Sequence, residues 1–300
     1  MKLLQCVGTT QQIQVGVEKY RIRRVIAKGG FSTIYSARRS GSSEKFAIKK
    51  IYAHSQLEVS RIRREIFAHQ TFGDHENLMN VLGVYRERYR EDASIFYLVM
   101  DYCAFGSLQD VLDANRKTEK LIAEADVLNY TRQLCAALDY MHRSQPSIAH
   151  RDVKPANLLR KTEKHLVLTD FGSVVVVPVE VTNHSEHLAT KDEAAELCTM
   201  PYRAPELFTC DVGMRYDERV DTWSAGCVLH ALCFHDSPFD AVHARGDSIA
   251  LATMSYRFRA PISHSYSDDL LHVLGMMLTV SSDDRPTCGL ILERLNEIGS

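Results

Sequence analysis

The length of 300 residues allows one large domain or two modest ones, with enough chain to bury a core without disulfide support. Hydrophobic residues make up 45% and charged residues 25%, which is ordinary for a globular protein and excludes collagen-like and low-complexity chains. The formal charge is −2 and no apolar run approaches the roughly 18 residues of a spanning helix, so we expect neither a broad nucleic-acid surface nor a transmembrane segment.

Residues 1–19 are assigned to an N-terminal tail, and the pattern from residue 20 to 100 is mostly strand-like. β-branched and aromatic residues are frequent there, as strands prefer. One helix is predicted at 56–72, because Ile62, Ile66 and His69 recur at helical spacing. Strands are predicted at 21–26, 32–38, 45–51, 78–85 and 95–100.

After Gly106 the longer segments have a helical pattern. A small β-rich half followed by a larger helical half predicts an α+β fold, with a ligand cleft at the join. Helices are predicted at 108–115, 124–142, 217–233, 248–254, 267–278 and 288–297, with a short β pair at 157–160 and 165–169.

A glycine-containing turn and a strand lysine are the first candidates for phosphate binding. Ala27-Lys28-Gly29-Gly30-Phe31-Ser32 lies between two strand-like runs, where glycines let backbone N–H groups approach an anion. In Phe46-Ala47-Ile48-Lys49, a period of two places Ala47 and Lys49 on one face, which could accept a flat ring and its phosphates. Taken alone, the two features also fit an ordinary hairpin turn and a solvated edge-strand lysine.

Glu65 borders the inward face of the predicted helix at 56–72. Its carboxylate could hold the Lys49 ammonium in place. Without further partners, a surface pair with Arg61 or His69 would explain it equally well.

Two motifs further along the chain supply those partners. His150-Arg151-Asp152-Val153-Lys154-Pro155-Ala156-Asn157 is followed thirteen residues later by Asp170-Phe171-Gly172. Together they provide two carboxylates, one ammonium and one amide on loops that flank a short β pair. Phosphoryl transfer needs such a set, because a carboxylate must accept the proton of the attacking hydroxyl and oxygen ligands must hold Mg²⁺.

In the order and spacing of these motifs the chain resembles eukaryotic protein kinases over residues 20–297. The resemblance implies a bilobal fold, with a small β-rich N-lobe at 20–100, a hinge at 101–105 and a larger helical C-lobe at 106–297. Ala204-Pro205-Glu206 and Asp221-Thr222-Trp223-Ser224-Ala225-Gly226 match later motifs of this family. Arg285 matches the arginine that pairs with the glutamate of the first of these, here Glu206.

The resemblance also implies roles for individual residues. Asp152 would be the catalytic base, and Lys154 would contact the γ-phosphate of ATP. Asn157 and Asp170 would hold Mg²⁺, while Lys49, paired with Glu65, would hold the α- and β-phosphates. The other residues expected to contact ATP are Ala27, Gly29, Gly30, Ile34, Ala47, Met100 at the gatekeeper position, Asp101, Cys103 and Leu159.

Lys154, two residues after Asp152, and Thr199, five residues before Ala204, resemble the serine/threonine rather than the tyrosine kinase pattern. We therefore expect Ser and Thr hydroxyls of protein substrates to be the phosphate acceptors. Two alternatives stay open, a pseudokinase scaffold without turnover and a kinase for small molecules. Ser107 lies where kinases that select basic substrates often carry an acid, so we expect little gain from arginine in a substrate.

Within the superfamily, residues 198–208 and 217–224 are similar to the Numb-associated kinases, and within these to the branch of myristoylated and palmitoylated serine/threonine kinases. Ala27 and Ser32 replace two glycines of the usual phosphate loop, which predicts a less flexible loop that still binds. Residue 2 is Lys, so we expect no N-myristoylation. We expect a cytoplasmic protein, and Cys6 leaves open palmitoylation with peripheral membrane or Golgi association.

The segment from Asp170 to Glu206 corresponds to the activation segment of the family. Thr190-Lys191-Asp192-Glu193 has the spacing of a capping box and predicts a short helix at 191–197. A segment with its own helix needs less support from phosphorylation, so we expect activity without an obligatory phosphosite. His184 and His187, just before it, are interpreted as part of a solvated loop rather than a metal site.

The eight cysteines are scattered singly, without a Cys-x-x-Cys pair or the Cys/His spacing of a zinc site. Reduced thiols are therefore expected.

Overall fold

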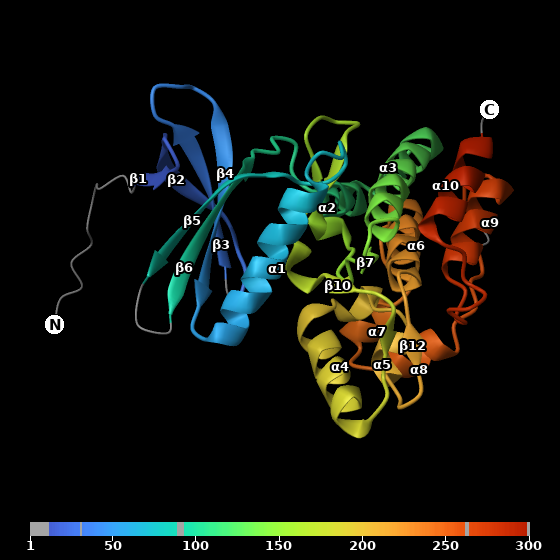
Figure 1. Ribbon diagram of the computed structural model, residues 1–300. Coiled ribbons are helices and arrows are strands. Elements are labelled where there is room, and N and C mark those ends of the chain that lie inside the picture. Colours follow the sequence, from blue (N-terminus) through green and yellow to red (C-terminus); the bar gives the residue numbers. More distant parts are fainter. Residues whose placement is uncertain (1–11, 31, 89–92, 262–263, 299–300) are drawn as a thin grey trace. The chain divides into compact units, whose positions relative to one another are not determined.

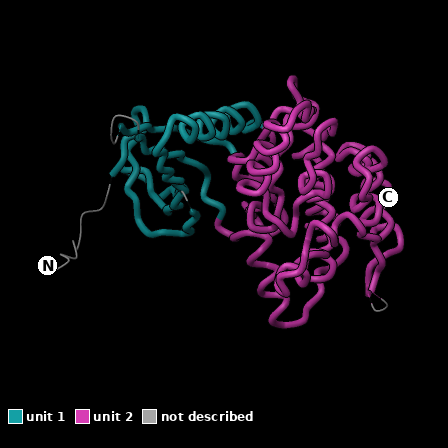
Figure 2. The backbone as a smooth tube through the Cα atoms, turned by 90° about the horizontal axis from the view of Figure 1, so that it is seen from below, with its two compact units in different colours: residues 1–74, 79–103 teal, residues 75–78, 104–300 magenta. Residues whose placement is uncertain are grey.

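The structure is a computed structural model that describes residues 12–30, 32–88, 93–261 and 264–298. The chain divides into two compact units (Figure 2), the first formed by residues 1–74 and 79–103 and the second by residues 75–78 and 104–300. Unit 1 consists mainly of β-strands and unit 2 mainly of helices (Figure 1), which confirms the predicted α+β class.

Unit 1 is built on one six-stranded antiparallel sheet with the strand order β1-β2-β3-β4-β6-β5. Its strands are β1 (Gln12–Val15), β2 (Glu18–Lys28), β3 (Ser32–Arg39), β4 (Lys45–Ala53), β5 (Val81–Arg88) and β6 (Ser94–Asp101). Each of the five predicted strands overlaps one of these. The predicted strand at 78–85 begins too early, because Leu78 belongs to unit 2, where it forms an isolated β-bridge with Leu168.

Strand β1 lies within the stretch that the sequence assigns to a tail. Ile13 and Val15 alternate with two glutamines and are buried against β2, and Gly16 turns the chain with a φ of +61°. Four residues are the shortest run in which alternation indicates a strand, so the signal is weak, and the strand was not predicted.

The two faces of β4 carry different residues, as its pattern predicts. Phe46 and Ile48 enter the hydrophobic core of unit 1, while Ala47 and Lys49 occupy the opposite face. The core also contains Ile13, Val15, Tyr20, Ile22, Ala37, Ile95, Tyr97 and Val99.

The single helix of unit 1 among the described residues, α1 (Gln56–Phe72), has the predicted bounds. Its N-cap is Ser55, whose side chain accepts a hydrogen bond from the Glu58 backbone N–H at 3.2 Å. The buried side of α1 carries apolar residues together with Glu65 and His69. The helix therefore brings one carboxylate and one imidazole into the interior of unit 1.

Unit 2 contains α2 (Leu108–Thr118), α3 (Glu124–His142), α4 (His184–Leu197), α5 (Glu206–Thr209), α6 (Arg219–Phe234), α7 (Asp240–Ala244), α8 (Ile249–Met254), α9 (Asp268–Met277) and α10 (Cys288–Glu297). The apolar side of α3 packs against α6 and α10 and forms the centre of the unit (Figure 1). The predicted bounds of α3 and α10 are confirmed.

Three two-stranded sheets lie in the loops of unit 2. They pair β7 (Ile148–Ala149) with β10 (Val175–Val176), β8 (Leu158–Arg160) with β9 (Leu166–Leu168), and β11 (Val179–Glu180) with β12 (Arg215–Tyr216). The predicted pair at 157–160 and 165–169 is the second of these. No helix in the described part of the chain is long and apolar enough to cross a membrane.

Helix α4 corrects two predictions. It begins at His184 rather than at residue 191, so His184 and His187 are helical and not part of a loop. The N-cap is Asn183, whose side chain accepts from the Glu186 N–H at 3.0 Å. Asn183 and Glu186 have the same spacing as the predicted capping box at Thr190, and the chain uses the earlier of the two signals.

Candidate active site

Unit 1 contains a buried ion pair between β4 and α1. The Lys49 Nζ lies 2.6 Å from Glu65 Oε1, with 11% and 5% of the two side chains exposed. A buried ammonium and a buried carboxylate are each costly without a charged partner, so the two residues hold each other in place. The pairing expected from the sequence is therefore confirmed as a contact.

Several residues predicted to contact ATP share one face of the sheet with Lys49. Ile34 lies directly opposite both Ala27 and Lys49 in the strand register, and Met100 lies opposite Ala47. Directly paired residues of antiparallel strands point to the same face. The sheet thus collects these side chains, which lie up to 73 positions apart in the sequence, on one surface.

The glycine-containing turn follows β2. The Gly29 N–H donates to the Ser32 carbonyl at 2.8 Å and closes the turn. A Cβ at Gly29 would lie 3.3 Å from Ser32 Oγ, whereas Gly30 has open space around it. Phe31 lies outside the described residues, so reduced flexibility of this turn stays a prediction. Asp101 ends β6, and Cys103 follows it, half-buried.

Unit 2 positions the segment around Asp152 through a buried carboxylate from α6. Asp221 is fully buried, and its two oxygens accept hydrogen bonds from the backbone N–H groups of His150 and Arg151, both at 2.7 Å. Arg151 has a φ of +66°, a conformation that is strained for a residue with a side chain. Asp221 therefore stabilises the unusual turn that presents Asp152.

Both carboxylate oxygens of Asp152 are engaged by neighbouring side chains. Oδ2 accepts from Lys154 Nζ at 2.8 Å and from Asn157 Nδ2 at 3.0 Å. Oδ1 accepts from the hydroxyl of Thr199 at 2.6 Å and from its backbone N–H at 3.0 Å, while Lys154 Nζ also donates to that hydroxyl at 2.7 Å. Four predicted residues thus form one connected network.

Asn157 and Asp170 are linked through the backbone. The Thr169 N–H donates to the Asn157 carbonyl at 3.0 Å, and Asp170 follows with a φ of +67°. The Asn157 amide nitrogen donates to Asp152, which leaves its amide oxygen to serve a metal ion. An amide oxygen and a carboxylate are ligands that Mg²⁺ prefers, so these two residues fit that ion. Leu159, which is half-buried in β8, lies two residues after Asn157 in the sequence.

His142, which the sequence did not single out, completes the environment of Asp221. Its Nε2 lies 2.9 Å from Asp221 Oδ2. Burial works against the charged imidazole, but the hydrogen bond to Asp221, together with the neighbouring Cys288, outweighs it and raises the pKa of His142 to about 10. Burial alone would raise the pKa of Asp221, but the contacts with His142 and His150 lower it. The result is a buried imidazolium–carboxylate pair directly behind the segment of Asp152.

Arg151 connects the same segment to the activation segment. Its Nε donates to the Ser173 carbonyl at 2.7 Å, its Nη1 to the Tyr216 hydroxyl at 3.4 Å, and its Nη2 lies 3.2 Å from Glu193 Oε1 in α4. Glu193 was expected to complete a capping box with Thr190, but the helix begins earlier. Nothing in the sequence pattern indicates that its carboxylate instead pairs with Arg151, 42 positions away.

The expected pair between Glu206 and Arg285 is confirmed as a contact. It is bidentate, with distances of 2.7 and 3.1 Å, and the arginine side chain is fully buried over the ring of Trp223. The pair connects the segment that follows Thr199 to the C-terminal helices of unit 2.

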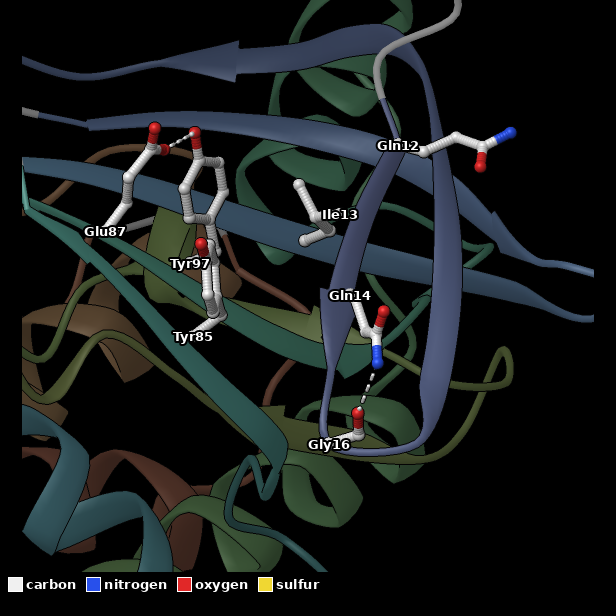
Figure 3. Close-up of a pocket in the computed structure, with 7 residues that line it drawn as sticks. All are labelled: Gln12, Ile13, Gln14, Gly16, Tyr85, Glu87 and Tyr97. Atoms are coloured by element: carbon white, nitrogen blue, oxygen red, sulfur yellow. Dashed lines mark hydrogen bonds between the residues drawn. The ribbon is translucent and has the colours of Figure 1, made fainter.

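A separate hollow of about 570 Å³ lies in unit 1 beside β1 and β5 (Figure 3). It is lined by Gln12, Ile13, Gln14, Gly16, Tyr85, Glu87 and Tyr97. None of these residues was predicted to bind ATP or Mg²⁺.

Comparisons with known proteins agree in pointing to one family. A family model described as the protein kinase domain matches residues 20–295. Serine/threonine-protein kinase 16 of Homo sapiens is 31% identical over 293 residues, which cover 98% of this chain and 94% of that protein. Serine/threonine-protein kinase ppk13 of Schizosaccharomyces pombe is 31% identical over 312 residues, covering 93% and 90%. A probable serine/threonine-protein kinase of Dictyostelium discoideum is 26% identical over 360 residues, covering 98% and 97%.

Proposed function

This chain belongs to the protein kinase family and is an ATP-dependent protein serine/threonine kinase, and we propose that the residues assembled around Lys49 and Asp152 carry out the transfer. The observation that carries it is the network in which Asp152, Lys154, Asn157 and Thr199 are mutually bonded.

In the proposed reaction, Asp152 Oδ1 accepts the proton of a Ser or Thr hydroxyl as the hydroxyl oxygen attacks the γ-phosphorus of ATP. The bond between the γ-phosphorus and the oxygen that bridges it to the β-phosphorus breaks, and ADP leaves. Thr199 now donates to Asp152 Oδ1 at 2.6 Å, which marks a position that a substrate hydroxyl can take. Lys154, 2.8 Å from Asp152, provides positive charge beside the transferring group. Lys49 binds the α- and β-phosphates, held at its position by Glu65.

Asn157 and Asp170 would hold Mg²⁺, which neutralises charge on the phosphates when it is bound. The remaining ATP contacts are proposed along the sheet face of Ala27, Ile34, Ala47 and Met100, on the half-buried Leu159, and through the backbone of Gly29, Gly30, Asp101 and Cys103.

Incubation of the purified protein with ATP, Mg²⁺ and a protein substrate tests the proposal. We expect steady turnover and phosphate on Ser and Thr residues, mapped by mass spectrometry, with Lys49→Met as the inactive control. ATP binding without any transfer would identify the chain as a pseudokinase scaffold. Transfer to free metabolites but not to proteins would favour the small-molecule alternative.

Three features stay predictions about the wider chain. The proposed kinase domain spans 20–297, with its hinge at 101–105. Cys6 and residue 2 lie outside the described residues, so palmitoylation of the former and the expected lack of myristoylation are not described by the structure. A cytoplasmic location, with peripheral membrane contact as the alternative, is part of the same proposal.

The proposed enzyme does not need a phosphosite in its activation segment. Replacing Ser173, Thr182, Ser185 and Thr190 together by alanine should leave most of the activity, because it keeps both Asn183, the N-cap of α4, and Glu193, the carboxylate that contacts Arg151. The measurement is kcat/KM on a peptide substrate, with phosphatase-treated wild type alongside. A loss of more than about tenfold, equivalent to roughly 1.4 kcal/mol of activation free energy, would reject this prediction.

Substrate choice should show little preference for arginine. Ser107 is the N-cap of α2, and its backbone N–H donates to Asp110 Oδ2 at 2.7 Å. The Asp110 carboxylate is therefore already engaged in a capping box, and it would bind a substrate cation more weakly than a carboxylate without such bonds. On a peptide array, replacing upstream residues by arginine should change the signal less than about threefold. A profile dominated by upstream arginine would contradict this expectation.

A further inference from the structure

The Arg151 guanidinium is a buried cation with one carboxylate beside it. Its side chain is fully buried, and the described groups around it are the Ser173 carbonyl, the Tyr216 hydroxyl and Glu193, with Cys198 nearby. Burial raises the pKa of the Cys198 thiol to about 11 and also raises that of Tyr216, so both are neutral near pH 7. Glu193 therefore supplies the negative charge.

In many kinases, a negative charge paired with an arginine controls whether the activation segment is ordered. Kinases that are switched by phosphorylation order the activation segment when a new phosphate pairs with arginine. Here a carboxylate that belongs to the segment itself already contacts the arginine at 3.2 Å, with only 26% of its side chain exposed.

Helix α4 needs such an attachment, because it buries little apolar surface. Ala194 is the only residue of its 14 that is fully buried. Isolated helices of this length are marginally stable in water, so contacts with the rest of unit 2 must hold it in place. Glu193 contributes the ion pair of α4 with the buried Arg151.

The position of α4 is transmitted directly to Asp152. Glu193 lies one turn before the end of the helix, and the Cys198 N–H closes that end on the Ala194 carbonyl at 3.0 Å. Thr199 follows immediately and donates twice to Asp152. The chain from Glu193 to Thr199 is thus attached at both ends to the two consecutive residues Arg151 and Asp152.

We propose that Glu193 is a positioning residue whose carboxylate permanently takes the place of an activating phosphate on Arg151, so that the activation segment is held without modification. The inference rests on the proposed kinase activity. Glu193 touches neither ATP nor the acceptor in this proposal and acts through Arg151 and Thr199. Its loss should therefore affect the use of the protein substrate more than the binding of ATP.

The test compares Glu193→Gln with Asp192→Asn, which removes the same charge from the exposed neighbouring residue of α4. We expect Glu193→Gln to lower kcat/KM for a peptide substrate by at least about tenfold, with the Kd of ATP changed by less than twofold. Asp192→Asn should stay within twofold of wild type. Glu193→Asp, which keeps the charge on a shorter side chain, should recover part of the loss.

Limited trypsin digestion provides a readout that does not require activity. Lys191 lies in α4, and we expect its cleavage to be faster in Glu193→Gln than in wild type or Asp192→Asn. If Glu193→Gln does not fold, the same comparison is made with Glu193→Asp, where a smaller increase is expected.

Equal activity and equal cleavage in Glu193→Gln and Asp192→Asn would overturn the inference, as would a wild type that loses more than tenfold of its activity on phosphatase treatment. A wild type without any turnover would instead contradict the proposed function, and the cleavage rates alone would then decide about Glu193.

Discussion

Asp152→Asn should lower kcat by about a thousandfold, the contribution typical of a positioned general base. The substitution keeps the size of the side chain but replaces a carboxylate oxygen by an amide nitrogen, which cannot accept a proton from the substrate. The new amide NH₂ would also point at a hydrogen-bond donor, because both carboxylate oxygens of Asp152 accept hydrogen bonds in the wild type, from Lys154, Asn157 and Thr199. The measurement is single-turnover transfer to a peptide at saturating ATP.

The control for this variant is the binding of ATP. Asp152 has no proposed contact with the nucleotide base or with the α- and β-phosphates, so the Kd of ATP should change by less than about threefold. Residual activity above a tenth of wild type would show that Asp152 is not the base. A simultaneous loss of ATP binding would show that the variant has lost its fold rather than its chemistry.

Local patterns predicted those parts of the fold whose stability is decided locally. Helix α1 has a Ser N-cap and a regular apolar spacing, and its bounds were predicted correctly. Strand β4 was predicted together with its two faces, because alternation leaves only one way to bury Phe46 and Ile48.

The start of α4 could not be decided in this way, because the sequence contains two capping signals seven residues apart. Asn183 with Glu186 and Thr190 with Glu193 both have the required spacing. In the structure Asn183 is the N-cap, and Glu193 pairs with the buried Arg151 instead of completing a capping box. That contact spans 42 positions, and no local pattern contains it.

The residues of the candidate site also divide into those that a sequence motif identifies and those that only a tertiary contact identifies. Lys49, Glu65, Asp152, Lys154, Asn157 and Asp170 were found because their motifs match a family. The structure joins Lys49 to Glu65 in unit 1, and Asp152 to Lys154 and Asn157 in unit 2. Asp170 follows Thr169, whose backbone N–H donates to the Asn157 carbonyl. The residues behind them lack such a motif. His142 ends a helix with an ordinary amphipathic pattern, and only the tertiary contact with Asp221 gives its imidazole a role.

That contact predicts a stability that depends on pH. The pKa of His142 is about 10 in the folded protein, above the ordinary value of 6.5 that applies to the unfolded chain. A raised pKa means that the folded state holds the proton more tightly. The contribution of His142 to the stability of the folded state is therefore fully present below pH 6.5 and is lost as the pH rises through 10.

His142→Gln should remove this contribution and leave the buried Asp221 carboxylate without its cation. We expect the free energy of unfolding near pH 6 to fall by about 3–5 kcal/mol, the usual cost of breaking a buried ion pair. The difference between wild type and variant should then shrink as the pH approaches 10, because the wild-type imidazole also loses its charge. Urea unfolding at several pH values measures both quantities.

His272→Gln is the matched control, since His272 is an exposed helical histidine in α9. Its substitution should change the free energy of unfolding by less than about 0.5 kcal/mol at any of these pH values. If the difference between wild type and His142→Gln is the same at pH 6 and pH 10, the imidazole is neutral in the folded protein. Asp221 would then be held by the backbone N–H groups of His150 and Arg151 alone, and the segment of Asp152 would depend on those two hydrogen bonds.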